Sequence, residues 1–153
     1  MRVLAIGAHP DDIEIACSGT LAKCVKRGDT VIVCHVSTGN LGHVIIPPDE
    51  LTIIRHEEAK RAGALAGIEV IGADFCDLDI FDNNRPARDR IVDVIRYADP
   101  DFIITHNPDD YMPDHRPQNF CIYIFMIIAR SRNITRLLKH SQWNQVYLLI
   151  NLL

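Results

Sequence analysis

The sequence predicts an α/β fold, a Rossmann-like three-layer sandwich in which helices cover both faces of a mostly parallel sheet. Short apolar runs alternate with longer segments of helical periodicity along most of its 153 residues. This alternation implies parallel strands joined by right-handed crossovers. No repeat, linker or low-complexity segment interrupts it, and a chain of this length suits one core. We therefore interpret residues 1–153 as a single domain.

The first predicted elements are two strands around one helix. Residues 2–6 form a short apolar run that ends at Gly7, which is typical of a buried strand. Residues 18–27 carry apolar side chains at helical spacing and are closed by a glycine, a common residue after a helix C-terminus. Residues 30–36 are β-branched and apolar, and they predict the second strand.

A loop containing glycine and proline separates these elements from the next ones. Residues 49–66 predict an amphipathic helix, and residues 69–75 predict a third strand. Residues 88–97 predict another helix, and the run Asp-Phe-Ile-Ile-Thr at 101–105 predicts the fourth strand. A further helix is expected from His115.

Composition and charge restrict the class of protein. The net charge is −4 and no face carries a Lys/Arg stripe, so nucleic acid and anionic membrane are disfavoured as partners. Five cysteines without CxxC spacing indicate free thiols in a reducing compartment. The apolar run at 3–6 is too short for a signal peptide, and the longest one, 120–129, is about half a membrane span. We expect a cytoplasmic protein without a membrane span.

Two polar clusters follow predicted strands, at residues 8–12 and 106–115. Ligands bind at the carboxyl ends of the strands in such sheets. If the strand order is the doubly wound 3-2-1-4, the first and fourth strands are neighbours, and the two clusters converge at one edge.

The residue types in these clusters indicate a metal. His9, Asp12 and His115 could supply three ligands to zinc and leave one position open, with Asp11 free to act as general base. The alternative is that the paired aspartates only cap a helix N-terminus. The spacing also leaves a hydrolase and a plain metal-binding protein equally open.

Separate blocks of residues carry a family resemblance. They read Ala8-His9-Pro10-Asp11-Asp12-Ile13-Glu14, Cys17-Ser18-Gly19-Thr20-Leu21, Ser37-Thr38-Gly39, Arg55-His56-Glu57-Glu58-Ala59 and Pro113-Asp114-His115-Arg116. In this order they resemble the signature of the LmbE-like, or PIG-L-like, deacetylases over residues 1–117. That family includes N-acetylglucosaminyl-phosphatidylinositol de-N-acetylase and enzymes that deacetylate GlcNAc-linked precursors of mycothiol and bacillithiol.

The resemblance implies a zinc-dependent N-deacetylase that hydrolyses the acetamide of a GlcNAc-type amino sugar or a related small amide. Its partner would be a small N-acetylated amino sugar conjugate, and a homo-oligomer is compatible with the family. Zinc could be replaced by another divalent metal such as Fe²⁺, because two histidines and a carboxylate also accept iron. The implied residues are the zinc ligands His9, Asp12 and His115, the base Asp11, the substrate contacts Arg55 and Asp77, and Asp114, which orients nearby imidazoles.

One departure from the family concerns a hydrogen-bond donor. The family commonly has a histidine where this chain has Met112, and a missing donor of this kind costs about 10²–10³ in rate. His106, six residues earlier, is a candidate substitute. We interpret His35 as a strand residue packed against a helix, and His43 and His56 as surface residues.

The other departure is the end of the chain, because residues 118–153 diverge from the family or are truncated. We predict a helix at 118–130 and a strand at 146–152, whose apolar residues could cover a sheet edge.

The sequence leaves two alternatives to the hydrolase. One is a metal-binding family member that is catalytically weak or inactive, and the other is a nucleotide-binding domain. The second is disfavoured because no Gly-x-Gly-x-x-Gly or P-loop follows the first strand.

Overall fold

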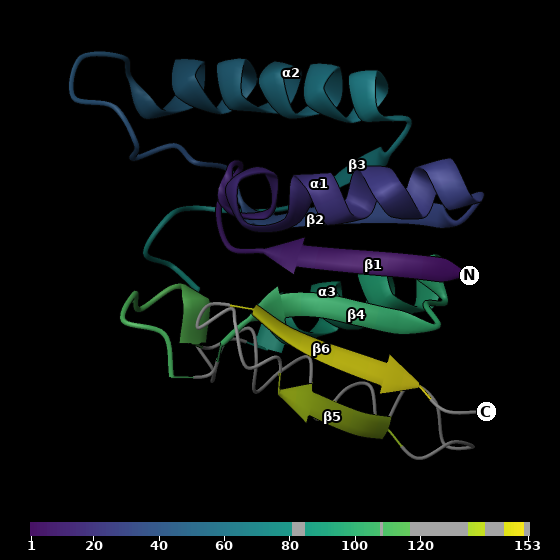
Figure 1. The fold of residues 1–153 in the computed structure, drawn as a ribbon. Coiled ribbons are helices and arrows are strands. Elements are labelled where there is room, and N and C mark those ends of the chain that lie inside the picture. The colour runs from purple at the N-terminus through teal and green to yellow at the C-terminus, as the bar shows by residue number, and fades with distance from the viewer. Residues whose placement is uncertain (81–84, 108, 117–134, 140–145, 152–153) are drawn as a thin grey trace.

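Helices cover both faces of a six-stranded sheet in the computed structural model (Figure 1). The structure describes residues 1–80, 85–107, 109–116, 135–139 and 146–151. Its elements are β1 (Arg2–Gly7), α1 (Asp12–Arg27), β2 (Thr30–Ser37), α2 (Pro48–Ala66), β3 (Glu69–Phe75), α3 (Arg85–Ala98), β4 (Phe102–His106), β5 (Thr135–Lys139) and β6 (Val146–Asn151). The strand order is β3-β2-β1-β4-β6-β5. The order 3-2-1-4, which was the condition for the two polar clusters to converge, is therefore present.

The sheet separates two hydrophobic cores, because alternate side chains of a strand point to opposite faces. Leu4 and Ile6 of β1 pack with the apolar face of α3, while Val3 and Ala5 pack with α1. Helix α2 lies on the same side as α1 and packs on β3 (Figure 1). Both faces of the parallel part of the sheet are thus covered, as in a doubly wound fold.

The helices begin earlier than the sequence predicted. Helix α1 starts at Asp12 rather than at residue 18, and α3 starts at Arg85 rather than at residue 88. The apolar stripe of α1 in fact continues to these earlier residues, since Ile13 and Cys17 pack in the same core as Leu21 and Cys24, and the prediction began the helix too late. Glycines close α1 and α2 in the left-handed conformation, at Gly28 (φ 94°) and Gly67 (φ 68°).

The tail adds two strands. Strand β6 pairs antiparallel with β4, which confirms the predicted final strand, whereas β5 was not predicted. The helix predicted at 118–130 lies outside the described residues. None of the described helices has the length and apolar character needed to cross a bilayer.

This topology brings the two polar clusters together. Strands β1 and β4 are adjacent and parallel, and Ile6 is level with Thr105. The loops that follow them therefore leave the same edge of the sheet, although they are about a hundred residues apart in sequence.

Candidate metal centre and its cavity

A tight turn after β1 presents the first set of polar side chains. The Asp12 carboxylate accepts the backbone N–H of His9 at 2.7 Å, and the Asp12 N–H donates to the His9 carbonyl at 3.3 Å. Asp11 occupies the N-cap position of α1, but its side chain makes no cap hydrogen bond. The capping interpretation of the paired aspartates is therefore wrong for Asp11, whose carboxylate is 55% exposed.

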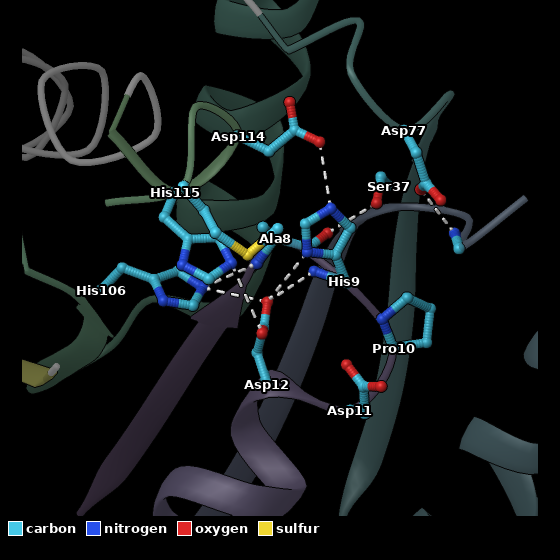
Figure 2. A network of polar contacts seen from close by, with 12 residues as sticks. Ala8, His9, Pro10, Asp11, Asp12, Ser37, Asp77, His106, Asp114 and His115 are labelled. Atoms are coloured by element: carbon cyan, nitrogen blue, oxygen red, sulfur yellow. Dashed lines mark hydrogen bonds and ion pairs between the residues drawn. The ribbon is translucent and has the colours of Figure 1, made fainter. Parts of the chain in front are cut away.

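Three side chains of this edge can hold one ion. Candidate ligand atoms of His9, Asp12 and His115 all lie within 4.8 Å of one another, and Figure 2 shows the three groups converging. His9 Nδ1 and His115 Nε2 each lie 3.5 Å from an Asp12 carboxylate oxygen. Tetrahedral zinc with bonds of about 2.0–2.1 Å places its ligand atoms roughly 3.3 Å apart. The donor set therefore fits zinc with little movement.

A second group of potential ligands, His106, Asp110 and His115, also lies within 4.8 Å. The rings of His106 and His115 are stacked, with centroids 3.8 Å apart and planes only 17° from parallel. An imidazole lone pair lies in the plane of its ring, so two stacked rings cannot direct lone pairs at one ion. The planes of His9 and His115, by contrast, differ by 52°. The geometry thus selects the first group.

Protonation in the metal-free site follows from these contacts. Burial disfavours a charge on His9, but contacts with Asp12 and Asp114 outweigh it and raise its pKa to about 9. Burial alone would raise the pKa of Asp12, yet His106 and His9 hold it well below its usual range. Burial and the neighbouring His106 lower the pKa of His115. His115 is therefore a neutral imidazole beside a carboxylate, the state in which it can bind a metal.

In each candidate histidine ligand, the ring nitrogen that does not face the site lies close to the carboxylate of a buried aspartate. Asp114 Oδ2 lies 3.0 Å from His9 Nε2 and also accepts the Leu78 N–H at 2.8 Å. Asp110 Oδ1 lies 3.1 Å from His115 Nδ1 and accepts the Met112 N–H at 3.0 Å. Metal-binding histidines commonly donate their second N–H to a carboxylate in this way.

Sequence analysis anticipated Asp114 but missed Asp110. The second of two adjacent aspartates in a loop carries no periodic signal that separates it from its neighbour. Asp109 is exposed, whereas the Asp110 side chain is only 3% exposed. Only the fold around the loop distinguishes the two.

A cavity of about 590 Å³ opens in front of the cluster. It is lined by His9, Pro10, Asp11, Asp12, Gly39, Leu41, Gly42, His43, Ile46, Leu51, Ile54, Arg55, Glu58, Asp77, Leu78 and Met112. Its volume lies within the range of roughly 300–1,000 Å³ that is usual for small-molecule sites. The proposed base and both predicted substrate contacts thus border one space.

Arg55 connects helix α2 to the turn after β1. Its guanidinium donates to the Pro10 carbonyl, lies 3.3 Å from Asp11 Oδ2 and donates to Glu58 at 2.9 Å. Gly39 allows this approach, since its φ is +73° and a Cβ there would lie 3.1 Å from Pro10. Arg55 therefore positions Asp11 as well as facing the cavity.

Asp77 has a structural contact that the sequence did not reveal. Its two carboxylate oxygens accept the backbone N–H groups of Gly39 and Leu41, each at 2.9 Å. The Asn40 side chain in turn accepts the Asp77 N–H at 2.9 Å. Asp77 therefore clamps the loop that forms one wall of the cavity.

The other histidines fall into distinct places. His106 lies next to the cluster: its Nε2 accepts the Ala8 N–H at 3.0 Å and lies 3.1 Å from Asp12 Oδ2, and, like His115, the residue is not among those lining the cavity. Met112 does line it. His35 is buried with Nε2 3.2 Å from Glu14 of α1, as predicted. The His56 side chain is 39% exposed and lies 3.2 Å from Asp74. His43 is exposed, as predicted, but it also borders the cavity.

Comparisons with known proteins agree with this geometry. A family model described as PIG-L, GlcNAc-PI de-N-acetylase, matches residues 4–124. The chain is 34% identical to diacetylchitobiose deacetylase of Thermococcus kodakarensis, covering 78% of this chain and 46% of the relative. It is also 30% identical to 4-oxalmesaconate hydratase of Pseudomonas putida, over 73% of this chain and 46% of that protein.

Among solved structures, N,N′-diacetylchitobiose deacetylase from Pyrococcus horikoshii superposes with a TM-score of 0.76 at 26% identity. The superposition covers 82% of this chain and 49% of that chain. The chain thus spans about half the length of the relatives that it matches.

Proposed function

The chain belongs to the PIG-L family of GlcNAc-PI de-N-acetylases, and from this membership and the site geometry we propose that it is a metal-dependent N-deacetylase. Its substrate is an N-acetylated amino sugar or a related small amide, and its products are acetate and the free amine. The observation that carries the proposal is the convergence of His9, Asp12 and His115 at the edge of a cavity bordered by Asp11.

The proposed metal ligands are His9, Asp12 and His115, and the ion is zinc, with Fe²⁺ as an alternative. When bound, the ion supplies the Lewis acid that polarises the acetamide carbonyl. Both imidazoles are held in orientation by buried carboxylates, so few rotamers remain to be ordered when the ion binds.

Asp11 is the proposed general base. Its carboxylate borders the cavity and is not used to cap α1, so it can take a proton from the attacking water. The same group can return that proton to the nitrogen as the C–N bond breaks. Arg55, 3.3 Å from Asp11, holds this carboxylate in place and faces the substrate.

Met112 limits the expected rate. It lines the cavity at the position where the family commonly has a histidine, and a thioether donates no hydrogen bond to a developing oxyanion. His106 does not replace that donor, since its Nε2 is engaged with the Ala8 N–H on the buried side. We expect turnover that is slow but measurable.

The charge of the cavity favours the deacetylase over the hydratase chemistry of one relative. Four carboxylates line it, on Asp11, Asp12, Glu58 and Asp77. Arg55 is the one arginine or lysine among the lining residues, and it is already paired with Asp11 and Glu58. With the charge of the proposed ion included, the lining keeps only a small net negative charge, but it offers a polyanionic substrate no unpaired arginine or lysine, and a neutral acetamide needs none.

Several further properties belong to this proposal. The described cysteines are free thiols, which suits a reducing compartment such as the cytoplasm. The described part of the fold carries no evidence for a nucleic-acid partner. Assembly of the chain into a homo-oligomer stays a prediction.

The test is the metal content of the purified protein beside its His115→Ala variant. We expect close to one equivalent of zinc or iron in the parent and a large loss in the variant. His56→Ala is the matched control, because that histidine is outside the cluster. Acetate release from N-acetylglucosamine conjugates should depend on the metal. A folded parent that neither holds nor accepts an ion would refute the proposal, and metal without turnover would favour the inactive family member.

A further inference from the structure

The cavity is lined by two chemically different groups of residues. Asp11, Arg55, Glu58 and Asp77 supply its charged groups around the candidate metal centre. The rest of its lining is largely aliphatic and comes from the loop after β2 and from α2: Leu41, Ile46, Leu51 and Ile54. Leu78 and Met112 add two apolar side chains beside the cluster, so most of the lining that is not charged is apolar.

The apolar wall belongs to a packed part of the fold. Leu51 is 5% exposed, and Leu51 and Ile54 are three residues apart on α2, so they share one face of the helix. Asp77 holds the loop that carries Leu41 through two backbone hydrogen bonds. The wall is thus present before a substrate arrives.

Apolar surface continues outward from this wall. Leu41 is 52% exposed, and the side chains of Val44 and Ile45 in the same loop are almost fully exposed. Contiguous exposed apolar side chains next to a cavity commonly mark a binding surface. Its continuity with the candidate metal centre makes the substrate the occupant that we infer for it.

A second sugar ring would fit this wall poorly. Its hydroxyl groups need hydrogen-bond partners when they leave water, and the four aliphatic side chains offer none. His43 of the same loop already accepts the Ile45 and Ile46 N–H groups at its Nδ1, which leaves only its Nε2 for a hydroxyl group. An uncharged apolar substituent loses nothing on such a wall and gains from burial.

We propose that the substrate is an N-acetylated amino sugar with an apolar, uncharged substituent, which lies against Leu41, Ile46, Leu51 and Ile54. This inference rests on the proposed function, which places the acetamide beside the candidate metal centre. It predicts that the chain prefers alkyl or aryl glycosides of N-acetylglucosamine to N,N′-diacetylchitobiose.

The experiment compares methyl and hexyl glycosides, each in both anomers. Affinity is measured by calorimetry with the free-amine products, which undergo no turnover, and kcat/KM is measured with the N-acetyl forms. A fully buried methylene contributes about fourfold in affinity. Five additional methylenes, partly buried, should give the hexyl product at least about tenfold tighter binding in one anomer.

Two neighbouring isoleucines of α2 provide the matched variants. Ile54 lines the cavity, whereas Ile53 is 66% exposed and does not. Ile54→Ser should remove most of the hexyl preference, because affinity for the hexyl product should fall far more than affinity for the methyl product. Ile53→Ser should keep both. Ile46→Ser provides a second substitution in the wall, in case Ile54→Ser fails to fold.

Equal binding of hexyl and methyl products by the wild type would overturn the inference. So would a hexyl preference that survives in a folded Ile54→Ser or Ile46→Ser protein, or a wall found covered by a second copy of the chain. A hexyl preference without hydrolysis of any N-acetyl form by metal-loaded protein would instead refute the proposed function, and the assignment of the wall would stand.

Discussion

Replacing Asp110 should weaken metal binding without a comparable loss of fold stability. Its Oδ1 atom lies 3.1 Å from His115 Nδ1 and accepts the Met112 N–H at 3.0 Å. A carboxylate this close to Nδ1 favours the tautomer in which Nδ1 carries the proton, and Nε2 then faces Asp12 with its lone pair. The carboxylate therefore acts on the ion only through His115.

The expected magnitude follows from what each variant removes. Asp110→Ala loses both contacts, and loss of such a carboxylate partner typically costs about 10–100-fold in metal affinity. Asp110→Asn keeps an oxygen acceptor at the same place but loses the charge. Because a charged acceptor makes hydrogen bonds about twice as strong as a neutral one, we expect a loss of roughly 3–10-fold for Asn.

The assay is competition for Zn²⁺ with a chromophoric chelator, supported by the d–d spectrum of the Co²⁺-loaded protein. Asp109→Asn is the matched control, since it removes the same charge from the adjacent, exposed position. Thermal unfolding of the metal-free proteins reports whether each variant folds. Wild-type affinity and an unchanged cobalt spectrum in folded Asp110→Ala would refute the positioning role.

Three other predictions concern the base, the packing of two helices and the thiols. Asp11→Asn should lower kcat by about 10²–10⁴ while metal content stays near that of the parent, because Asp11 is a base and not a ligand. Gly63→Ala should destabilise the fold by about 1–3 kcal/mol, since its Cβ would clash with a valine of β3 and lie 2.8 Å from a backbone carbonyl. Gly19→Ala, with open space around it in α1, should instead stabilise by about 0.5–1 kcal/mol in thermal or urea unfolding. Burial raises the pKa of the Cys17 thiol to about 12, so at pH 8 it stays protonated, and iodoacetamide should modify the exposed Cys76 first in peptide mapping.

Each of these predictions has a contradicting result. Loss of metal in Asp11→Asn would make Asp11 a ligand, and unchanged kcat would remove its role as base. Equal stability changes for Gly63→Ala and Gly19→Ala would mean that α2 does not pack closely on β3. Alkylation of Cys17 at the rate of Cys76 in folded protein would contradict its burial.

Local pattern was sufficient for most of the framework. The alternation of β-branched runs with helical periodicity predicted the first four strands and three helices, and it failed mainly at helix starts such as Asp12 and Arg85. Ile13 and Cys17 extend the apolar stripe of α1 to its first turn, but the run Ile13-Glu14-Ile15 also alternates like a strand, so the pattern alone did not place the helix start. The strand β5 was missed because its sequence, Thr-Arg-Leu-Leu-Lys, is short and carries two basic residues, whereas the apolar run of β6 in the same tail was predicted.

The candidate ligands were predictable for a related reason. His9 and Asp12 follow a strand within five residues of its end, and His115 follows another, so the edge rule for parallel sheets placed them together. The structure confirms that they converge. Their binding of an ion stays a prediction until metal content is measured.

The sequence by itself thus determined the fold class and the identity of the residues that would meet at one edge if the first and fourth strands were neighbours. These depend on periodicity and on residue type, which are local properties. Only the tertiary structure decided that Asp110 and not Asp109 supports His115, that His106 stacks behind the cluster, and that Asp77 clamps the cavity loop. The reason is physical, because these choices depend on the orientation of side chains from segments up to a hundred residues apart. No spacing along the chain records that orientation.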